Sequence, residues 1–170
     1  MNNEQPVLGK GLLAADRLAH ANINPATGLA TDYLNHFNEV VMLLEMLPAM
    51  PECAEDVLDW SPVPYEAHFE TSTFKDKELA VMAYRAAPQK LRTHLEARVA
   101  AINSAVESAQ QQIREAPDVS IAAADICEMA IQLIRPLISQ ASGIIHGYTA
   151  PDPSQAEGED AQAEIDAMFA

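Results

Sequence analysis

The chain has 170 residues and a net charge of -15, and 49% of its residues are hydrophobic although only 5% are aromatic. This acidic balance argues against binding to nucleic acid or to an anionic membrane surface, because both would repel the protein. Six glycines and an alanine-rich apolar fraction favour helices over strands, and they predict an all-α protein.

The first 26 residues carry a weak pattern. They lack a basic segment followed by an apolar one, so we expect no signal peptide and a cytoplasmic protein. A short amphipathic helix is compatible with the leucines of this region, but Gly9 and Gly11 weaken it. The turn-forming residues at 22–28 predict a loop.

The next stretch carries the helical period over 31–47, and Pro48 and Pro51 end it. Two short helices, at about 52–60 and 64–72, are expected in the proline-rich segment that follows. Trp60 and Phe69 are expected to hold this segment on the rest of the fold, a role in packing.

A helix is predicted at 75–87, and a longer one runs from Pro88 to Glu115. Proline suits the first turn of a helix, where its missing N–H is not needed. Apolar residues then repeat every three or four positions and predict a seam that packs on another helix: Leu91, Leu95, Val99, Ile102, Val106, Ala109 and Ile113.

The turn at 116–120 offers Asp118 or Ser120 as a cap for a further helix, which reaches about Ile145. Two helices joined by so short a turn predict an antiparallel helical hairpin at about 88–147. The N-terminal helices, or a second copy of the chain in a homodimer, would complete a helical bundle. Polar residues form one stripe along the second helix: Asp125, Glu128, Gln132, Arg135, Ser139, Ser142 and His146.

Pro136 lies within this second helix. It has no N–H to donate to the carbonyl of Gln132, four residues earlier, so a kink with a free carbonyl is expected there.

The C-terminal residues change character. Prolines, a glycine and acids at 148–158 predict a flexible linker between a helical domain at 1–147 and a short helix at 159–170. Ile165, Met168 and Phe169 share one face of that helix, which would fold by docking into a groove of a partner.

Glu128 and Gln132 are one helical turn apart, so they share a face. With Asp125 upstream and an apolar pair and Arg135 downstream, this helix resembles the active-site helix of the CheZ family, phosphatases of the chemotaxis response regulator CheY. The family usually has aspartate where this chain has Glu128. The tail, Q-A-E-I-D-A-M-F at 162–169, is similar to the CheY-binding peptide at the start of the flagellar switch protein FliM, and CheZ also ends in a linker and a CheY-binding helix.

The resemblance implies a phosphatase that binds a CheY-like receiver domain and hydrolyses its aspartyl phosphate. Gln132 would orient the attacking water, because loose phosphoryl transfer needs positioning more than a strong base. Glu128 would pair with a lysine of the receiver, which also supplies Mg²⁺, so the chain would need no cofactor of its own. The residues implied in binding the partner are Asp125, Arg135, Ile165, Asp166, Met168 and Phe169.

Two alternatives remain open at this level. The chain could be a non-catalytic adaptor that binds the same receiver in chemotaxis or another two-component pathway. It could instead be a metal-binding helical bundle, since His36 and Glu39 share a helix and His68, His94 and His146 lie on others, although the usual Glu-x-x-His order is missing. The spacing of Cys53 and Cys127 supports no zinc or redox motif.

Overall fold

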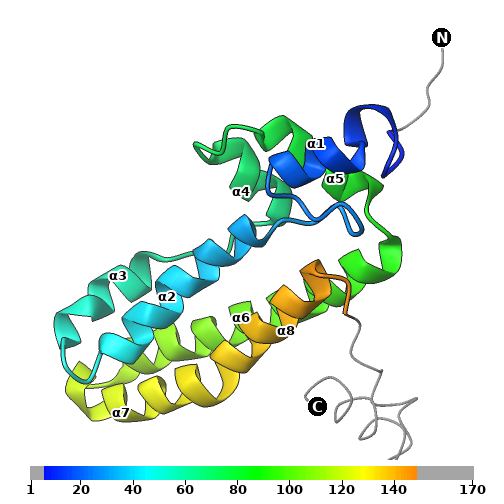
Figure 1. Ribbon diagram of the computed structural model, residues 1–170. Helices are drawn as coiled ribbons and strands as arrows, with labels where there is room; N and C mark the ends of the chain where they lie inside the picture. The colour runs from blue at the N-terminus through cyan, green and yellow to red at the C-terminus, as the bar shows by residue number, and fades with distance from the viewer. Residues whose placement is uncertain (1–5, 149–170) are drawn as a thin grey trace, which may run out of the picture.

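The computed structural model describes residues 6–148, and within this range it contains helices and no strand, which confirms the all-α class (Figure 1). The segments, in chain order, are η1 (Gly11–Leu13), α1 (Ala15–His20), η2 (Thr31–Leu34), α2 (Asn35–Met46), η3 (Pro51–Cys53), α3 (Ala54–Asp59), α4 (Tyr65–Thr71), α5 (Lys77–Ala86), α6 (Gln89–Glu115), α7 (Val119–Met129), η4 (Ala130–Ile134) and α8 (Arg135–Ile145).

These bounds confirm the predicted helical stretches. The prediction at 31–47 corresponds to η2 followed by α2, and the two short helices of the proline-rich segment correspond to α3 and α4. Helices α5 and α6 begin and end within two residues of the predicted 75–87 and 88–115. Apart from Tyr148, the predicted linker at 148–158 and the predicted helix at 159–170 lie outside the described residues.

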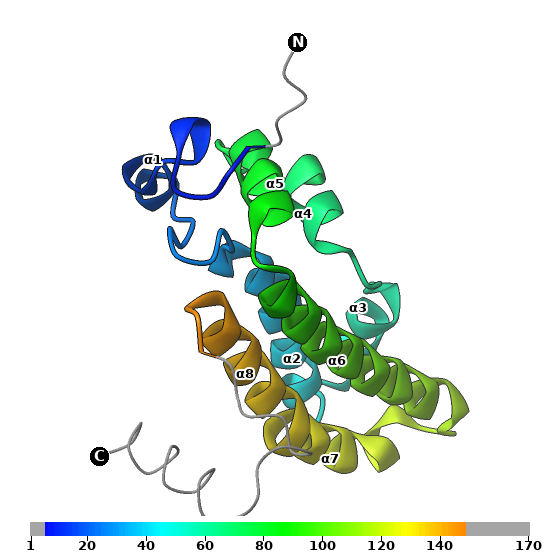
Figure 2. The ribbon, with the colours of Figure 1, turned by 90° about the vertical axis from the view of Figure 1, so that its right-hand side faces the viewer.

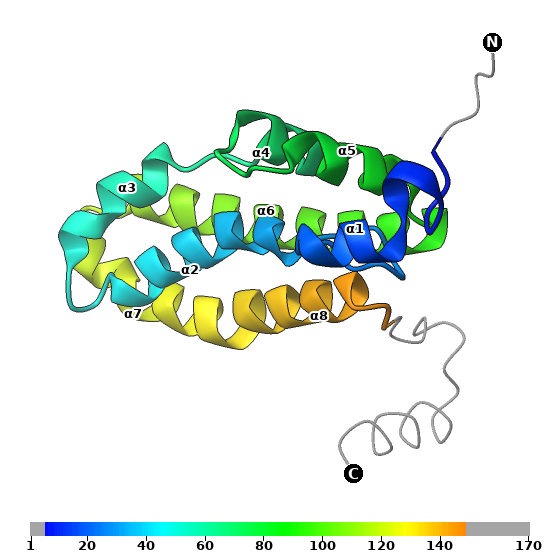
Figure 3. The ribbon, with the colours of Figure 1, turned by 45° about the horizontal axis from the view of Figure 1, so that its top comes forward.

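Three long stretches form the centre of the molecule: α2, α6, and the continuous helical run α7–η4–α8. Helix α6 packs against α8, while α2 packs against α7 and η4. Figures 1 and 2 show that α6 and α8 lie side by side and run in opposite directions, and Figure 3 shows α2 running along the same pair. The buried faces of the three stretches form one core, which includes Phe37, Val41, Leu44, Ile102, Val106, Ile126, Ile134 and Ile144.

Helices α1, α4 and α5 cover one end of this core, as Figure 2 shows. Aromatic side chains connect that end to α2. Tyr33 contacts both Phe37 and Tyr65 edge-on, with ring centroids 5.1 and 5.0 Å apart. The buried hydroxyl of Tyr65 accepts a hydrogen bond of 2.8 Å from the N–H of Ala30. These contacts give Tyr33, Phe37 and Tyr65 a packing role, and Phe69, for which this role was expected, is fully buried.

The loop at 22–28 is held by its own side chains. Asn24 accepts hydrogen bonds from the N–H groups of Ala26 and Thr27, and the Thr27 hydroxyl donates to the carbonyl of Ile145 over 2.7 Å. That bond satisfies one of the carbonyls left free at the end of α8. Gly28 has a φ of +75°, and a Cβ there would lie 2.7 Å from the carbonyl oxygen of Ala83, so only glycine fits.

Gln110, which the seam of α6 does not include, is buried. Its amide nitrogen donates to the carbonyls of Val57 and Trp60, over 2.9 and 2.8 Å. These carbonyls lie at the end of α3, where that of Val57 also accepts the N–H of Trp60 over 3.2 Å and that of Trp60 depends on Gln110. One side chain of α6 therefore fixes the position of α3.

Within residues 6–148, none of the helices combines the length and the apolar character that crossing a membrane requires.

Candidate functional site

The helix that carries Glu128 and Gln132 begins at a defined cap. The carboxylate of Asp118 accepts a hydrogen bond of 3.0 Å from the N–H of Ser120, so Asp118 fills the capping role that the sequence offered to either residue. This hydrogen bond lowers the pKa of Asp118. The first turn of α7 is thereby fixed beside the turn that joins it to α6.

The run does not stay α-helical up to Pro136. Residues Ala130–Ile134 form a π-helical turn, in which the N–H of Arg135 donates to the carbonyl of Ala130, five residues earlier. Pro136 predicted an irregularity at this place in the helix, but the predicted form was a kink, whereas the structure has a π turn. Isolated π turns within α-helices are frequent at functional sites.

The buried positions of the run explain the π turn. Ile126, Ala130, Ile134 and Ile138 are all buried and follow one another in steps of four. Three such steps take twelve residues, whereas three α-helical turns take about eleven, so a straight α-helix would rotate one of these side chains off the core. The π turn accommodates the additional residue and keeps all four on the core side.

Glu128 and Gln132 flank the junction of α7 and η4, and both side chains are exposed. Neither makes a hydrogen bond or an ion pair with any residue in the range 6–148. Asp125, one turn earlier, is exposed as well. A carboxylate and an amide therefore stand on the surface with their hydrogen-bonding groups available to a partner.

Apolar side chains lie beside this pair. Ile131 and Leu133, the sequence neighbours of Gln132, are 49% and 46% exposed. The polar stripe predicted from the sequence does not include Leu133, but the side chain is half in solvent because the π turn changes the register of the helix. Ile131 and Leu133 therefore place apolar surface directly beside the exposed carboxylate and amide.

Arg135 is already engaged within the chain. Its guanidinium makes a two-pronged contact with the carboxylate of Glu45 on α2, through Nε to Oε1 and through Nη2 to Oε2 at 2.6 Å. The thiol of Cys127 approaches the carbonyl of the same Glu45 at 3.5 Å. The hydrogen bond from Arg135 lowers the pKa of Glu45, and the same contact raises the pKa of Arg135.

We expect the Glu45–Arg135 pair to contribute about 0.5–1 kcal/mol to the free energy of unfolding, since both groups are partly exposed and solvent screens them. Urea unfolding of Glu45→Gln, Arg135→Gln and the double variant measures this coupling. The pKa of Glu45 is lower in the folded protein than in the unfolded chain. The stabilisation by the pair is therefore fully present at pH values above the pKa that Glu45 has in the unfolded chain, and it is lost as the pH falls through the pKa that Glu45 has in the folded protein.

The ion pair Glu66–Arg85 serves as the comparison for the double-mutant cycle at Glu45 and Arg135. It has the same two-pronged geometry, but the Arg85 side chain is 65% exposed, against 47% for Arg135. Its coupling should be smaller. An equal or larger coupling free energy for Glu66–Arg85 would show that solvent exposure does not determine the strength of these two ion pairs.

The histidines do not assemble a metal site in the part of the chain that the structure describes, where no group of three or more His, Cys, Asp and Glu side chains is placed to hold an ion. Instead, Nε2 of His68 lies 3.0 Å from the carboxylate of Asp32. His36 stacks on Trp60, with ring centroids 4.6 Å apart. These contacts give the two histidines a role in packing.

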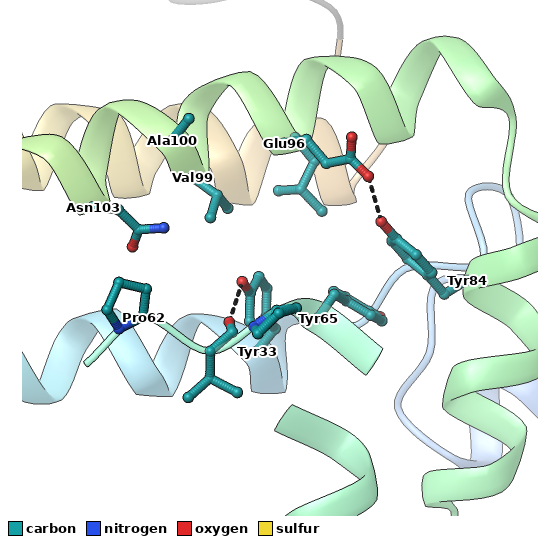
Figure 4. A pocket seen from close by; sticks show the side chains of 11 residues that line it. Tyr33, Pro62, Tyr65, Tyr84, Glu96, Val99, Ala100 and Asn103 are labelled. Atoms are coloured by element: carbon teal, nitrogen blue, oxygen red, sulfur yellow. Dashed lines mark hydrogen bonds between the residues drawn. The ribbon is translucent and has the colours of Figure 1, made fainter. Parts of the chain in front are cut away.

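A separate pocket of about 370 Å³ opens between α6 and the segment 62–65 (Figure 4). Tyr84 donates a hydrogen bond of 2.7 Å to Glu96 across its mouth, and the Tyr33 hydroxyl donates to the carbonyl of Val63. Burial raises the pKa of Tyr33 and Tyr84, so their hydroxyls stay protonated. No pattern in the sequence predicted this pocket, although the tyrosines that line it and the prolines at 62 and 64 are recognisable there.

The structure thus brings Asp125, Glu128 and Gln132 onto one surface and places Arg135 in contact with α2. The other predicted partner-binding residues, Ile165, Asp166, Met168 and Phe169, lie outside the described residues. Comparisons with models of protein families, with curated proteins and with solved structures found no match.

Proposed function

We propose that this protein binds a response-regulator receiver domain and accelerates hydrolysis of its aspartyl phosphate. The observation that carries the proposal is the exposed pair Glu128 and Gln132, whose side chains have no partner among residues 6–148 and which adjoin a π turn. The resemblance of this stretch to the active-site helix of the CheZ family gives the pair its chemistry.

In this proposal Gln132 enters the receiver's site and orients a water in line with the phosphorus. An amide can hold a water by donating to it and accepting from it, and phosphoryl transfer through a loose transition state needs little more than such positioning. Glu128 pairs with a receiver lysine. The Mg²⁺ and the phosphorylated aspartate belong to the receiver. Ile131 and Leu133 exclude water from the rim of the contact.

The scaffold for this site is the antiparallel helical hairpin of about 88–147, completed into a bundle by α2 or by a second copy in a homodimer. Residues 159–170 act as a tethered receiver-binding helix. A tether of this kind raises the effective concentration of the receiver at the hairpin without any new contact there. Chemotaxis or another two-component pathway in the cytoplasm would supply the receiver.

A non-catalytic adaptor is the second candidate, and the contact of Arg135 with Glu45 favours it. The resemblance assigns Arg135 to the partner, but its guanidinium is held by α2. An adaptor needs only the tail and an accessible surface, with no demand on the geometry of Gln132.

The test is the decay of phosphorylated CheY-like receivers from the same organism, followed as released phosphate with and without the full chain. We expect one receiver to decay faster and to bind the chain. Phe169→Asp in the tail should weaken that binding strongly, because it places a charge on the apolar face of the docking helix.

Gln155→Asp in the linker is the matched control and should leave binding unchanged. Binding without faster decay supports the adaptor. If no receiver binds or decays faster, both candidates are wrong.

A further inference from the structure

A groove of about 880 Å³ runs between α2 and α3, away from Glu128 and Gln132. Its walls combine apolar and acidic side chains, and nothing in the proposed phosphatase chemistry uses it. The groove is lined by His36, Glu39, Met42, Leu43, Met46, Asp56, Asp59, Trp60, Ser61 and Val63.

The apolar part of the groove includes two methionine side chains. Met42 and Met46 lie one turn apart on α2 and are 54% and 37% exposed, so the core does not account for them. Leu43 and Trp60 continue this apolar surface. Methionine side chains are flexible and polarisable, which allows one such surface to fit the apolar stripes of different helices.

The rest of the groove lining is negatively charged. Glu39 stands on α2, and Asp56 and Asp59 stand on α3 across from it. All three are exposed, and none of them forms an ion pair within residues 6–148. No lysine or arginine lines the groove. Its charge therefore favours a cationic occupant.

His36 adds an unsatisfied polar atom. Its Nε2 is buried beside the groove without a hydrogen-bond partner in the described part of the chain. Burial, followed by repulsion from His68, lowers the pKa of His36, so the ring is neutral at pH 7 and adds no positive charge of its own.

We propose that this groove, lined by α2 and α3, binds a basic amphipathic helix of another protein. The apolar stripe of such a helix would lie on Met42, Met46 and Leu43. Its lysines and arginines would reach Glu39, Asp56 and Asp59. Helices with this pattern are recognised in the same way by other methionine-rich grooves.

Two other occupants fit the charge poorly. The sequence of the C-terminal segment 159–170 has apolar residues at helical spacing, but its charged residues are all acidic, namely Glu159, Asp160, Glu164 and Asp166. A second copy would bring another net charge of -15 to a groove that is already negative. A basic partner avoids both repulsions.

Trp60 is the only tryptophan of the chain and lines the groove, so its emission reports occupancy directly. The probe is a synthetic Leu/Lys amphipathic peptide of about 18 residues, roughly 27 Å long as a helix, which contains no tryptophan. We expect a saturable blue shift of Trp60 at one peptide per chain. A scrambled peptide of equal charge should bind at least about tenfold more weakly, a difference of about 1.4 kcal/mol.

Two double variants test the two parts of the groove: Met42→Gln with Met46→Gln, and Asp56→Asn with Asp59→Asn. Each replaces exposed side chains, so the fold should persist, as circular dichroism would verify. We expect each to weaken peptide binding about tenfold. The matched controls replace exposed residues away from the groove, Leu12→Gln with Ile121→Gln, and Asp16→Asn with Glu107→Gln, and they should bind as the wild type does.

Equal binding of the scrambled peptide would overturn the proposal, because attraction to the overall negative charge would then explain the contact. So would groove variants that bind within twofold of the wild type. A shift of Trp60 emission that depends on protein concentration without any peptide would assign the groove to a second copy instead. None of these outcomes depends on the phosphatase assay.

Discussion

Replacing Gln132 with alanine should abolish the acceleration of receiver dephosphorylation and leave receiver binding nearly unchanged. The amide is the only group in the proposed site that holds the attacking water. Misplacing a reacting group by about 1 Å costs roughly 100-fold in rate, so losing the positioning group should cost at least that much. Single-turnover decay of the phosphorylated receiver measures the rate, and titration of the unphosphorylated receiver measures binding.

Gln140→Ala provides the control for this variant. Gln140 is exposed on α8, outside the π turn, and carries the same functional group. It should retain wild-type activity. If Gln132→Ala also retains it, Gln132 does not position the water, and the protein does not use the mechanism that the CheZ resemblance implies.

Replacing Gln110 with methionine should lower the free energy of unfolding by about 1–3 kcal/mol. Methionine keeps the length and shape of glutamine, so no cavity forms, but the carbonyl of Trp60 loses its donor and that of Val57 keeps only the N–H of Trp60. A buried acceptor left without a partner costs about 1–3 kcal/mol. Urea unfolding followed by Trp60 emission measures the change, and the signal reports on the end of α3 itself.

Gln111→Met is the control for the second prediction. Gln111 is the next residue on α6, is exposed, and donates only to the side chain of Glu115 on the same helix. Its replacement should change the stability by less than about 0.5 kcal/mol. Equal losses for the two variants would show that the loss at Gln110 comes from helix propensity rather than from the bond to α3.

The helices were predictable because their signals are local. The period of apolar residues along α2 and α6, and the prolines at 48, 51 and 88, give their bounds within a few residues. The role of Gln110 could not be recognised from the same pattern, because the carbonyls that it binds lie 53 and 50 positions earlier in the chain. The pairing of Arg135 with Glu45, ninety residues apart, was hidden for the same reason.

The candidate site was predictable only as a set of residues on one helical face. The spacing of Glu128 and Gln132 predicted a shared face, and both side chains are exposed. The exposure of Leu133 was not foreseen, because α-helical geometry assigned it to the apolar side. Pro136 signalled a broken hydrogen bond, yet a missing donor is compatible with either a kink or a π turn. The buried residues Ile126, Ala130, Ile134 and Ile138, each four positions after the last, favour the π turn over the kink. Their burial is known only from the folded structure.

The π turn also bears on how the helix can move. A π turn is one surplus residue, and in a uniform helix such a defect can migrate as each hydrogen bond is exchanged for the next. Pro136, the second residue of α8, has no N–H to exchange, so the defect cannot pass beyond it along α8. The contact of Arg135 with α2 anchors the helix at the adjacent residue. Gln132 therefore lies in a π turn whose position along the helix is fixed by Pro136 and by the contact of Arg135 with α2.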